Sequence, residues 1–302
     1  MALQRSPERV DHLVWKRVNV DGRAASYGVG GAGLPVLFFH GWGLSERSYR
    51  RPLRRLVAMG CQVWAPALPG FGGTDHLPRG ETSLAGYAAW ADAFMDSVGI
   101  EGPALVVGHS FGGGVAITLA HRFPARVRAL VLVNSVGGAT WSLAGRRVRS
   151  MSKRPLWHWG LHLSGDVLPL PQLARVLPVF LEDALPNALR NPMAVWQAAQ
   201  LARKADLTAE LEDLKARQLP VVAVWSERDQ IIPRASFDAL CAAEGTPGQV
   251  VEGNHSWLLV DPDRFAAVMN APVEAARRAW QLEAPAPKPG IVARLLRGRG
   301  LG

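Results

Sequence analysis

The stretch Leu105-Val106-Val107-Gly108-His109-Ser110-Phe111-Gly112-Gly113-Gly114 decides the fold of this 302-residue chain. It runs from an apolar, strand-like segment through a G-x-S-x-G pattern into the start of a helix. Small residues beside Ser110 suit a tight turn whose backbone is strained. A serine at a helix N-terminus, where free N–H groups favour developing negative charge, is expected to act as a nucleophile.

Outward from this turn, short apolar runs alternate with longer amphipathic stretches. This alternation predicts strands and helices that form a mostly parallel sheet. The pair Asp21-Gly22 predicts a two-residue hairpin turn between the first two strands. Eight strands are expected, near His12–Asn19, Arg23–Gly30, Pro35–Phe39, Gln62–Ala65, Ala104–Val107, Ala129–Asn134, Pro220–Trp225 and Gln249–Glu252. Helices are expected near Glu46–Met59, Ser83–Val98, Phe111–His121, Ala235–Ala243 and Pro262–Gln281.

The alternation stops after the sixth expected strand. The next segment is rich in Trp, Leu and Pro with helical spacing, which indicates a helical insertion. The last residues are rich in proline, glycine and basic residues and predict a flexible tail. The expected organisation is a core of residues 1–138 and 215–283, a helical lid at 139–214 and a tail at 284–302.

The net charge of +9 is local rather than spread along the chain. Neither basic cluster has the interleaved aromatic residues of a base-stacking surface, so nucleic-acid binding is not expected. The two cysteines lie far apart in sequence, and neither a metal site nor a cofactor is expected. No segment is as long and apolar as a signal peptide or a membrane span, so a soluble cytoplasmic protein is expected. The clusters are Arg146, Arg147, Arg149, Lys153 and Arg154, and in the tail Lys288, Arg294, Arg297 and Arg299.

A serine hydroxyl is a weak nucleophile at neutral pH, so Ser110 needs a general base and a carboxylate that orients the base. Asp229 follows the strand expected at Pro220–Trp225, and His255 follows the last expected strand. The order serine, acid, histidine is that of this type of site. Glu227 is a weaker candidate for the acid. His40 and His109 each lie beside a glycine in a motif, where a structural role is more natural.

Acyl transfer also needs hydrogen-bond donors for the oxyanion of the tetrahedral intermediate. The stretch Phe38-Phe39-His40-Gly41-Trp42-Gly43 ends the third strand, and its turn is expected to present the backbone N–H of Trp42 opposite that of Phe111. The apolar lid is expected to help line an acyl-binding cleft, although the same side chains would also pack the lid against the core. The candidate substrate-binding side chains are Trp42, Phe111, Trp157, Trp159 and Trp257.

These motifs resemble those of capped members of the α/β-hydrolase superfamily, over roughly residues 10 to 282. The landmarks are His40-Gly41-Trp42-Gly43, Leu68-Pro69-Gly70-Phe71-Gly72, Gly108-His109-Ser110-Phe111-Gly112 and Gly253-Asn254-His255. The resemblance implies the α/β-hydrolase fold, with an eight-stranded mostly parallel sheet flanked by helices, a helical lid after strand 6, and hydrolysis without a cofactor. The segment His40–Leu44 is also similar to that of carrier-protein methyl ester esterases, which suggests an acidic carrier protein as a partner of the basic stretch Arg146–Arg154.

The expected activity is hydrolysis of a carboxylic ester or thioester with an apolar acyl or aromatic group. Haloalkane dehalogenases and epoxide hydrolases of similar build carry aspartate at the position of Ser110, which argues against both. A hydrolase of carbon–carbon bonds that uses the same three residues stays open. So does a slow-turnover ligand receptor or signalling protein of this fold.

Overall fold

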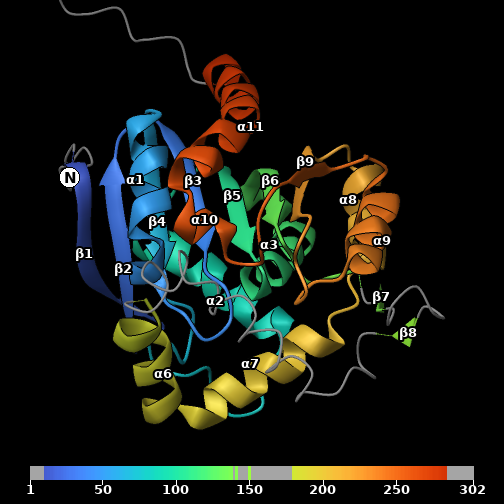
Figure 1. Cartoon of the computed structure of the whole chain (residues 1–302). Helices are drawn as coiled ribbons and strands as arrows, with labels where there is room; N and C mark the ends of the chain where they lie inside the picture. Colours follow the sequence, from blue (N-terminus) through green and yellow to red (C-terminus); the bar gives the residue numbers. More distant parts are fainter. Residues whose placement is uncertain (1–9, 139, 142–148, 151–178, 284–302) are drawn as a thin grey trace, which may run out of the picture.

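One eight-stranded sheet forms the centre of the computed structural model, which describes residues 10–138, 140–141, 149–150 and 179–283 (Figure 1). The strand order is β1-β2-β4-β3-β5-β6-β9-β10. Within this sheet, β2 alone runs in the direction opposite to that of the other strands. The mostly parallel sheet of the α/β-hydrolase fold is thereby confirmed. The strands are β1 (Val10–Val20), β2 (Arg23–Gly31), β3 (Leu34–Phe39), β4 (Cys61–Pro66), β5 (Ala104–His109), β6 (Val127–Val133), β9 (Val221–Ser226) and β10 (Gln249–Val251).

The hairpin between β1 and β2 closes through Asp21 and Gly22, as the sequence predicts. Their φ angles are 49° and 81°, both positive, as a two-residue turn of the primed type requires. The Asn19 side chain accepts a hydrogen bond from the Gly22 N–H at 2.7 Å. This local chemistry sets the register of the sheet edge.

Helices cover both faces of the sheet, so β5, in the middle, is buried along its whole length. Side chains alternate between the faces: Val106 belongs to one core cluster, whereas Leu105 and Val107 belong to the other. The first cluster includes residues of α2 (Leu84–Ser97), α3 (Phe111–Arg122), α8 (Thr208–Ala216) and α9 (Arg234–Glu244). The second includes residues of α1 (Arg50–Ala58), α10 (Trp257–Val260) and α11 (Pro262–Glu283).

The expected end of the insertion, residue 214, falls inside α8. That helix packs against α3 and α9, with Leu211 and Leu214 fully or almost fully buried. The chain rejoins the core earlier, where Asp206 bridges to Gly137 and Gly138. The helix α8 therefore belongs to the layer that flanks the sheet, because its apolar side faces the core.

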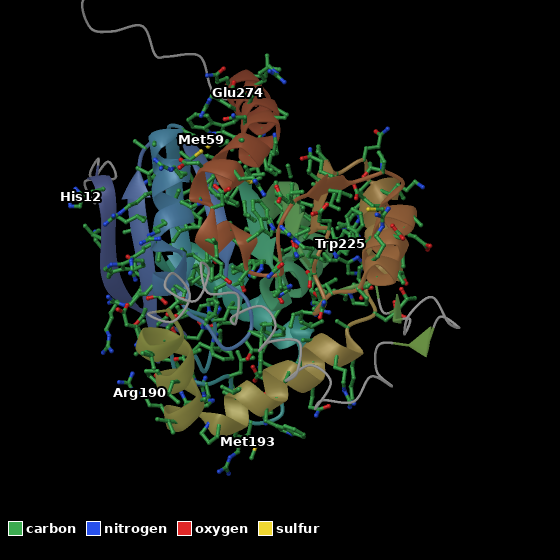
Figure 2. All side chains as sticks on the ribbon, in the orientation of Figure 1. His12, Met59, Arg190, Met193, Trp225 and Glu274 are labelled. Atoms are coloured by element: carbon green, nitrogen blue, oxygen red, sulfur yellow. The ribbon has the colours of Figure 1, made fainter. Side chains whose placement is uncertain are left out.

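Within the insertion, α6 (Leu185–Arg190) and α7 (Pro192–Lys204) lie at the opposite end of the molecule from the C-terminal end of α11 (Figure 1). The Asn187 amide donates to the Gly43 carbonyl, and the Asn191 amide donates to the Gly70 carbonyl, both at 3.1 Å. Since Gly43 and Gly70 follow β3 and β4, the two helices lie over loops at the carboxyl edge of the sheet. On the outer side of these helices, Arg190 and Met193 point away from the core (Figure 2).

A buried carboxylate ties the insertion to the loop after β3. Asp183, in a short π-helix at Phe180–Ala184, accepts hydrogen bonds from the Ser45 N–H at 2.6 Å, from the Ser45 hydroxyl and from the Ser48 hydroxyl. Hydrogen bonds to a carboxylate are strong, so Asp183 holds the insertion firmly against this loop. Glu46, which follows Ser45 in the sequence, is also buried.

Several features expected from the sequence lie outside the described residues. They include Trp157 and Trp159, most of the basic stretch Arg146–Arg154 and the tail 284–302. The ends of the insertion that are described include two short paired strands, β7 (Thr140–Trp141) and β8 (Arg149–Ser150). In the part of the chain that the structure describes, none of the helices is long and apolar enough to cross a membrane.

The buried Glu46 predicts a pH-dependent stability. Burial, reinforced by repulsion from Asp183, raises the pKa of Glu46 to about 7, whereas a glutamate in an unfolded chain has a pKa of about 4.3. The folded protein keeps this proton between those values while the unfolded chain has lost it, so the group favours unfolding increasingly as the pH rises to 7. Glu46→Gln is expected to raise the free energy of unfolding at pH 8 by roughly 3–4 kcal/mol, and by much less at pH 4.

Urea unfolding of both proteins at the two pH values measures this difference. Glu81→Gln, at an exposed position, serves as the control and should leave the profile unchanged. A Glu46→Gln effect of the same size at pH 4 and pH 8 would contradict the assignment.

Candidate active site

The turn at Ser110 joins β5 directly to α3 and holds the serine in an unusual backbone conformation. Its φ and ψ angles are 54° and −118°, and positive φ is strained for a residue with a Cβ. The neighbouring Gly112 leaves no room for a side chain, since a Cβ there would lie 2.4 Å from the Phe39 carbonyl oxygen. The backbone of the turn is thus pressed against the end of β3, and the small residues of the motif are required by close packing.

The three residues that the sequence proposed as nucleophile, base and acid form a continuous hydrogen-bonded chain. The Ser110 hydroxyl lies 2.9 Å from Nε2 of His255, and Nδ1 of His255 lies 2.8 Å from Oδ2 of Asp229. All three residues are buried, with 5–6% of their surface exposed. Each comes from the carboxyl end of a different parallel strand, β5, β9 or β10, which is why residues far apart in sequence meet here.

Four donors surround the carboxylate of Asp229. The backbone N–H groups of Ile231 and Ile232 donate to Oδ1 at 2.8 and 2.9 Å, while Oδ2 accepts from His255 and from the side-chain amide of Asn134. Hydrogen bonds of this kind stabilise a carboxylate in its charged form. Glu227, the weaker candidate for the acid, is exposed at the surface and forms an ion pair with Arg228.

Sequence reasoning did not assign a role to Asn134, the residue directly after β6. Its backbone has a positive φ of 45°, and its side chain contacts Asp229, the Ser226 hydroxyl and the indole N–H of Trp257. The Ser226 hydroxyl in turn donates to the Asn254 carbonyl at 2.8 Å. A polar residue at the carboxyl end of a buried parallel strand was the available signal, because such ends converge at one edge.

His40 has the structural role that its place beside a glycine suggested. Its Nε2 accepts a hydrogen bond from the Leu68 N–H and its Nδ1 donates to the Gly41 carbonyl, both at 2.8 Å. Burial lowers the pKa of His40 to about 4, which is consistent with one donor and one acceptor nitrogen. The ring therefore joins the loop after β3 to the loop after β4 and is not free to accept a proton from Ser110.

The loop after β3 lies against Ser110. A Cβ on Gly41 would be 3.3 Å from the Cβ of Ser110, so the loop that carries Trp42 lies beside the serine. The Trp42 indole N–H donates to the Val195 carbonyl of α7 at 2.7 Å, and its ring is half-buried. Trp42 thus connects the insertion with the loop expected to bind the oxyanion.

Two of the expected substrate-binding side chains pack inside the protein. Phe111 is fully buried, with its ring edge-to-face against Tyr87 at 5.2 Å. Trp257 is 3% exposed, lies in the core cluster on the other face of the sheet and contacts Phe265. Both side chains pack in the core next to the turns that carry them.

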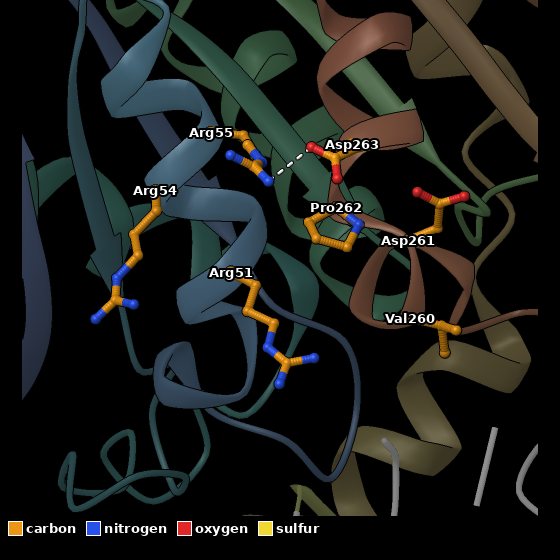
Figure 3. A pocket seen from close by; sticks show the side chains of 7 residues that line it. All are labelled: Arg51, Arg54, Arg55, Val260, Asp261, Pro262 and Asp263. Carbon is orange, nitrogen blue, oxygen red and sulfur yellow. Dashed lines mark ion pairs between the residues drawn. The ribbon is translucent and has the colours of Figure 1, made fainter. Parts of the chain in front are cut away.

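A hollow of about 790 Å³ is lined by other residues (Figure 3). It is formed between α1 and the start of α11 and contains none of the expected site residues. Its lining is charged, and Arg55 pairs there with Asp263 at 2.7 Å. An acyl group needs an apolar surface next to the nucleophile, so this hollow is not a substrate cleft for Ser110. Its lining residues are Arg51, Arg54, Arg55, Val260, Asp261, Pro262 and Asp263.

Comparison with known families gives a match to the model of the alpha/beta hydrolase family over residues 36–268. The chain belongs to the α/β-hydrolase family. That match covers every strand from β4 to β10 and includes Ser110, Asp229 and His255.

Relatives of this chain include hydrolases named for different substrates. The chain is 39% identical over 227 residues to the pimeloyl-[acyl-carrier protein] methyl ester esterase of Aromatoleum aromaticum, covering 68% of this chain and 83% of that protein. It is 29% identical over 255 residues to the 2-hydroxymuconate semialdehyde hydrolase of Pseudomonas putida, covering 77% and 82%. Among solved structures, an esterase from Rhodococcus sp. ECU1013 has the same fold, with a TM-score of 0.66, 22% identity and coverage of 87% and 99%.

The strained turn predicts that glycine at position 110 stabilises the fold relative to alanine. Glycine adopts positive φ at little cost, whereas the Cβ of alanine keeps the strain. Ser110→Gly is therefore expected to have a free energy of unfolding about 1 kcal/mol higher than Ser110→Ala. Urea unfolding of the two variants measures the difference, and equal stabilities would show that the turn stores no strain.

Proposed function

We propose that this α/β hydrolase is a serine hydrolase that cleaves a carboxylic ester or thioester through an acyl-enzyme intermediate. The observation that carries the proposal is the hydrogen-bonded chain from Ser110 through His255 to Asp229. In this assignment Ser110 is the nucleophile, His255 the general base and Asp229 the residue that orients the imidazole. Its support is chemical: a serine hydroxyl becomes a useful nucleophile only beside a base that takes its proton.

In the first step, Nε2 of His255 removes the hydroxyl proton while the Ser110 oxygen attacks the carbonyl carbon. The resulting oxyanion is bound by the backbone N–H groups of Trp42 and Phe111. The imidazolium then protonates the leaving alcohol or thiol, and the acyl group stays on Ser110. Water, deprotonated by His255, attacks the acyl-enzyme and releases the acid, and the His255 proton returns to Ser110.

Asp229 stays ionised through both steps. Its hydrogen bond to Nδ1 of His255 fixes the tautomer in which Nε2 can accept a proton, and it favours the imidazolium when that forms. The donors from Ile231, Ile232 and Asn134 hold the carboxylate in place. Glu227 is exposed and pairs with Arg228, which is a reason to prefer Asp229 as the acid.

The proposed substrate has an apolar acyl or aromatic group, and the insertion is proposed to act as the lid that selects it. Support comes from α6 and α7, which contact the loops around Trp42, and from the Trp- and Leu-rich composition of the insertion. A finer proposal, that the acyl group arrives on an acidic carrier protein, draws on the positive charges between Arg146 and Arg154 and on the carrier-linked substrate named for the relative from Aromatoleum.

A second candidate is cleavage of a carbon–carbon bond, and its support is the similarity to the 2-hydroxymuconate semialdehyde hydrolase of Pseudomonas putida. The same serine, histidine and aspartate serve that reaction class. Because the two candidates share their machinery, they differ in substrate and not in the residues that a variant would test. A 2-hydroxy-6-oxo-dienoate and an ester panel, assayed on the same preparation, separate them.

Substitution of Ser110 tests the nucleophile. Ser110→Ala is expected to lower kcat for p-nitrophenyl esters by about 10⁴ or more, and Asp229→Asn by somewhat less, because the oriented base and the nucleophile act as a unit. Initial rates over a series of acyl chain lengths, with and without a fluorophosphonate probe, provide the measurement. Glu227→Gln is the matched control for the acid and should keep most of the activity.

Each outcome of this assay is informative. Sustained, Ser110-dependent turnover with an optimum at medium chain length or at aromatic acyl groups supports the ester assignment. Much faster hydrolysis of acetyl esters would contradict the proposed acyl pocket. Turnover of the dienoate but not of esters would favour the carbon–carbon hydrolase, and a Ser110→Ala variant with near wild-type activity would remove both candidates. Labelling of Ser110 by the fluorophosphonate without sustained turnover of any substrate would indicate a receptor.

A further inference from the structure

A second buried chain of hydrogen bonds, which the proposed reaction does not use, runs behind Ser110. The Gly41 N–H donates to the Tyr49 hydroxyl oxygen at 2.9 Å, and that oxygen lies 2.7 Å from Nδ1 of His109. Nε2 of His109 lies 3.1 Å from the backbone carbonyl oxygen of His255. Tyr49 and His109 are 0% and 1% exposed, so water does not compete for these groups.

The partners fix where the protons of this chain are. A neutral imidazole has one donor nitrogen and one acceptor nitrogen. The His255 carbonyl oxygen only accepts, so Nε2 of His109 must carry the proton, and Nδ1 is left as the acceptor. The Tyr49 hydroxyl therefore donates to Nδ1 while its oxygen accepts from Gly41. In the other tautomer, a nitrogen lone pair would face the His255 carbonyl oxygen at 3.1 Å.

His109 is kept neutral by its surroundings. Burial lowers its pKa well below the ordinary value, and the nearby His255 and His40 rings add to the effect. Burial likewise raises the pKa of Tyr49, so its hydroxyl keeps the proton that it donates. The His109 and His255 rings are 4.9 Å apart between centroids. A cation at His109 would oppose formation of the His255 imidazolium, so a fixed neutral tautomer is the form compatible with catalysis.

We propose that Tyr49 and His109 are positioning residues that keep the three segments of the site in register. The chain of hydrogen bonds joins the loop after β3 at Gly41, the end of β5 at His109 and the loop after β10 at His255. These segments supply the expected Trp42 N–H, the nucleophile and the base. The inference rests on the proposed function, since the register matters only if Ser110 and His255 exchange a proton.

The contact to His255 is made to its backbone, which sets how its side chain is aimed. The imidazole reaches Ser110 at 2.9 Å and Asp229 at 2.8 Å. A shift of about 1 Å in a reacting group lowers the rate by up to about 100-fold. Loss of the His109 hydrogen bond lets the backbone of His255 move, while the surface that binds the substrate is unchanged. The effect should therefore fall on kcat and not on KM.

Three substitutions at His109 separate its two hydrogen bonds. The amide of glutamine reaches the place of Nε2 and donates to the His255 carbonyl, whereas asparagine is too short to do so and retains only an acceptor for Tyr49. Phenylalanine keeps the ring and removes both bonds. Relative to wild type, kcat for the best p-nitrophenyl ester is expected to fall about 10- to 100-fold in His109→Asn and His109→Phe and only about threefold in His109→Gln.

Tyr49→Phe tests the other end of the chain. It is expected to lower kcat by about 10-fold, and to have little further effect in the His109→Phe background, because both changes break one network. Tyr87→Phe is the matched control: Tyr87 is a buried tyrosine whose hydroxyl donates to the Pro69 carbonyl at 3.1 Å, outside this chain. It should lose stability but keep kcat.

Three measurements on each variant decide the question: kcat and KM, the rate at which a fluorophosphonate labels Ser110, and the free energy of unfolding. A parallel fall of kcat and labelling rate with unchanged KM, and rescue by glutamine but not asparagine, is the expected result. If His109→Phe and Tyr49→Phe lose only stability, or if glutamine and asparagine behave alike, the positioning role is refuted. If instead wild type shows no Ser110-dependent labelling or turnover, the proposed function itself has failed.

Discussion

The backbone turn at Ser110 is the constraint on which the rest of the site depends. Its positive φ is unfavourable for a residue with a side chain, and it persists because the sheet holds both ends. The Ser110 N–H donates to the Val133 carbonyl at 3.0 Å, while the Ser110 carbonyl accepts from Gly113 and Val136 at 3.0 and 3.2 Å. Pairing of β5 with β6 and close packing of α3 against the end of β3 thus hold the strained turn in place. The stability of the core keeps Ser110 at the edge of the sheet.

Around this turn, buried polar groups are arranged so that each has a partner. Asn134 and Ser226 connect the ends of β6 and β9 with the loop of His255, and Tyr49 and His109 connect the loop after β3 with the same loop from the other side. A buried polar group without a partner is costly, so these networks restrict the loops to one arrangement. The geometry that the proposed proton transfer needs therefore depends on the loops and on their supports together.

The insertion adds a different kind of contact. Its helices α6 and α7 reach the loops after β3 and β4 through side-chain amides and through Trp42, and Asp183 binds the serines that follow Trp42. The insertion is thus joined to the loop that carries Trp42, which is expected to bind the oxyanion.

The sequence by itself determined the eight strands, the Asp21-Gly22 hairpin and the order of Ser110, Asp229 and His255, because strands and tight turns are local patterns and parallel strands end at one edge. The tertiary structure alone decided that α8 joins the core layer, that Phe111 and Trp257 are buried, that Asn134 contacts Asp229 and that Tyr49 contacts His109. These outcomes depend on which side chains meet across the fold, and an apolar or polar residue carries no local sign of the partner that it will contact.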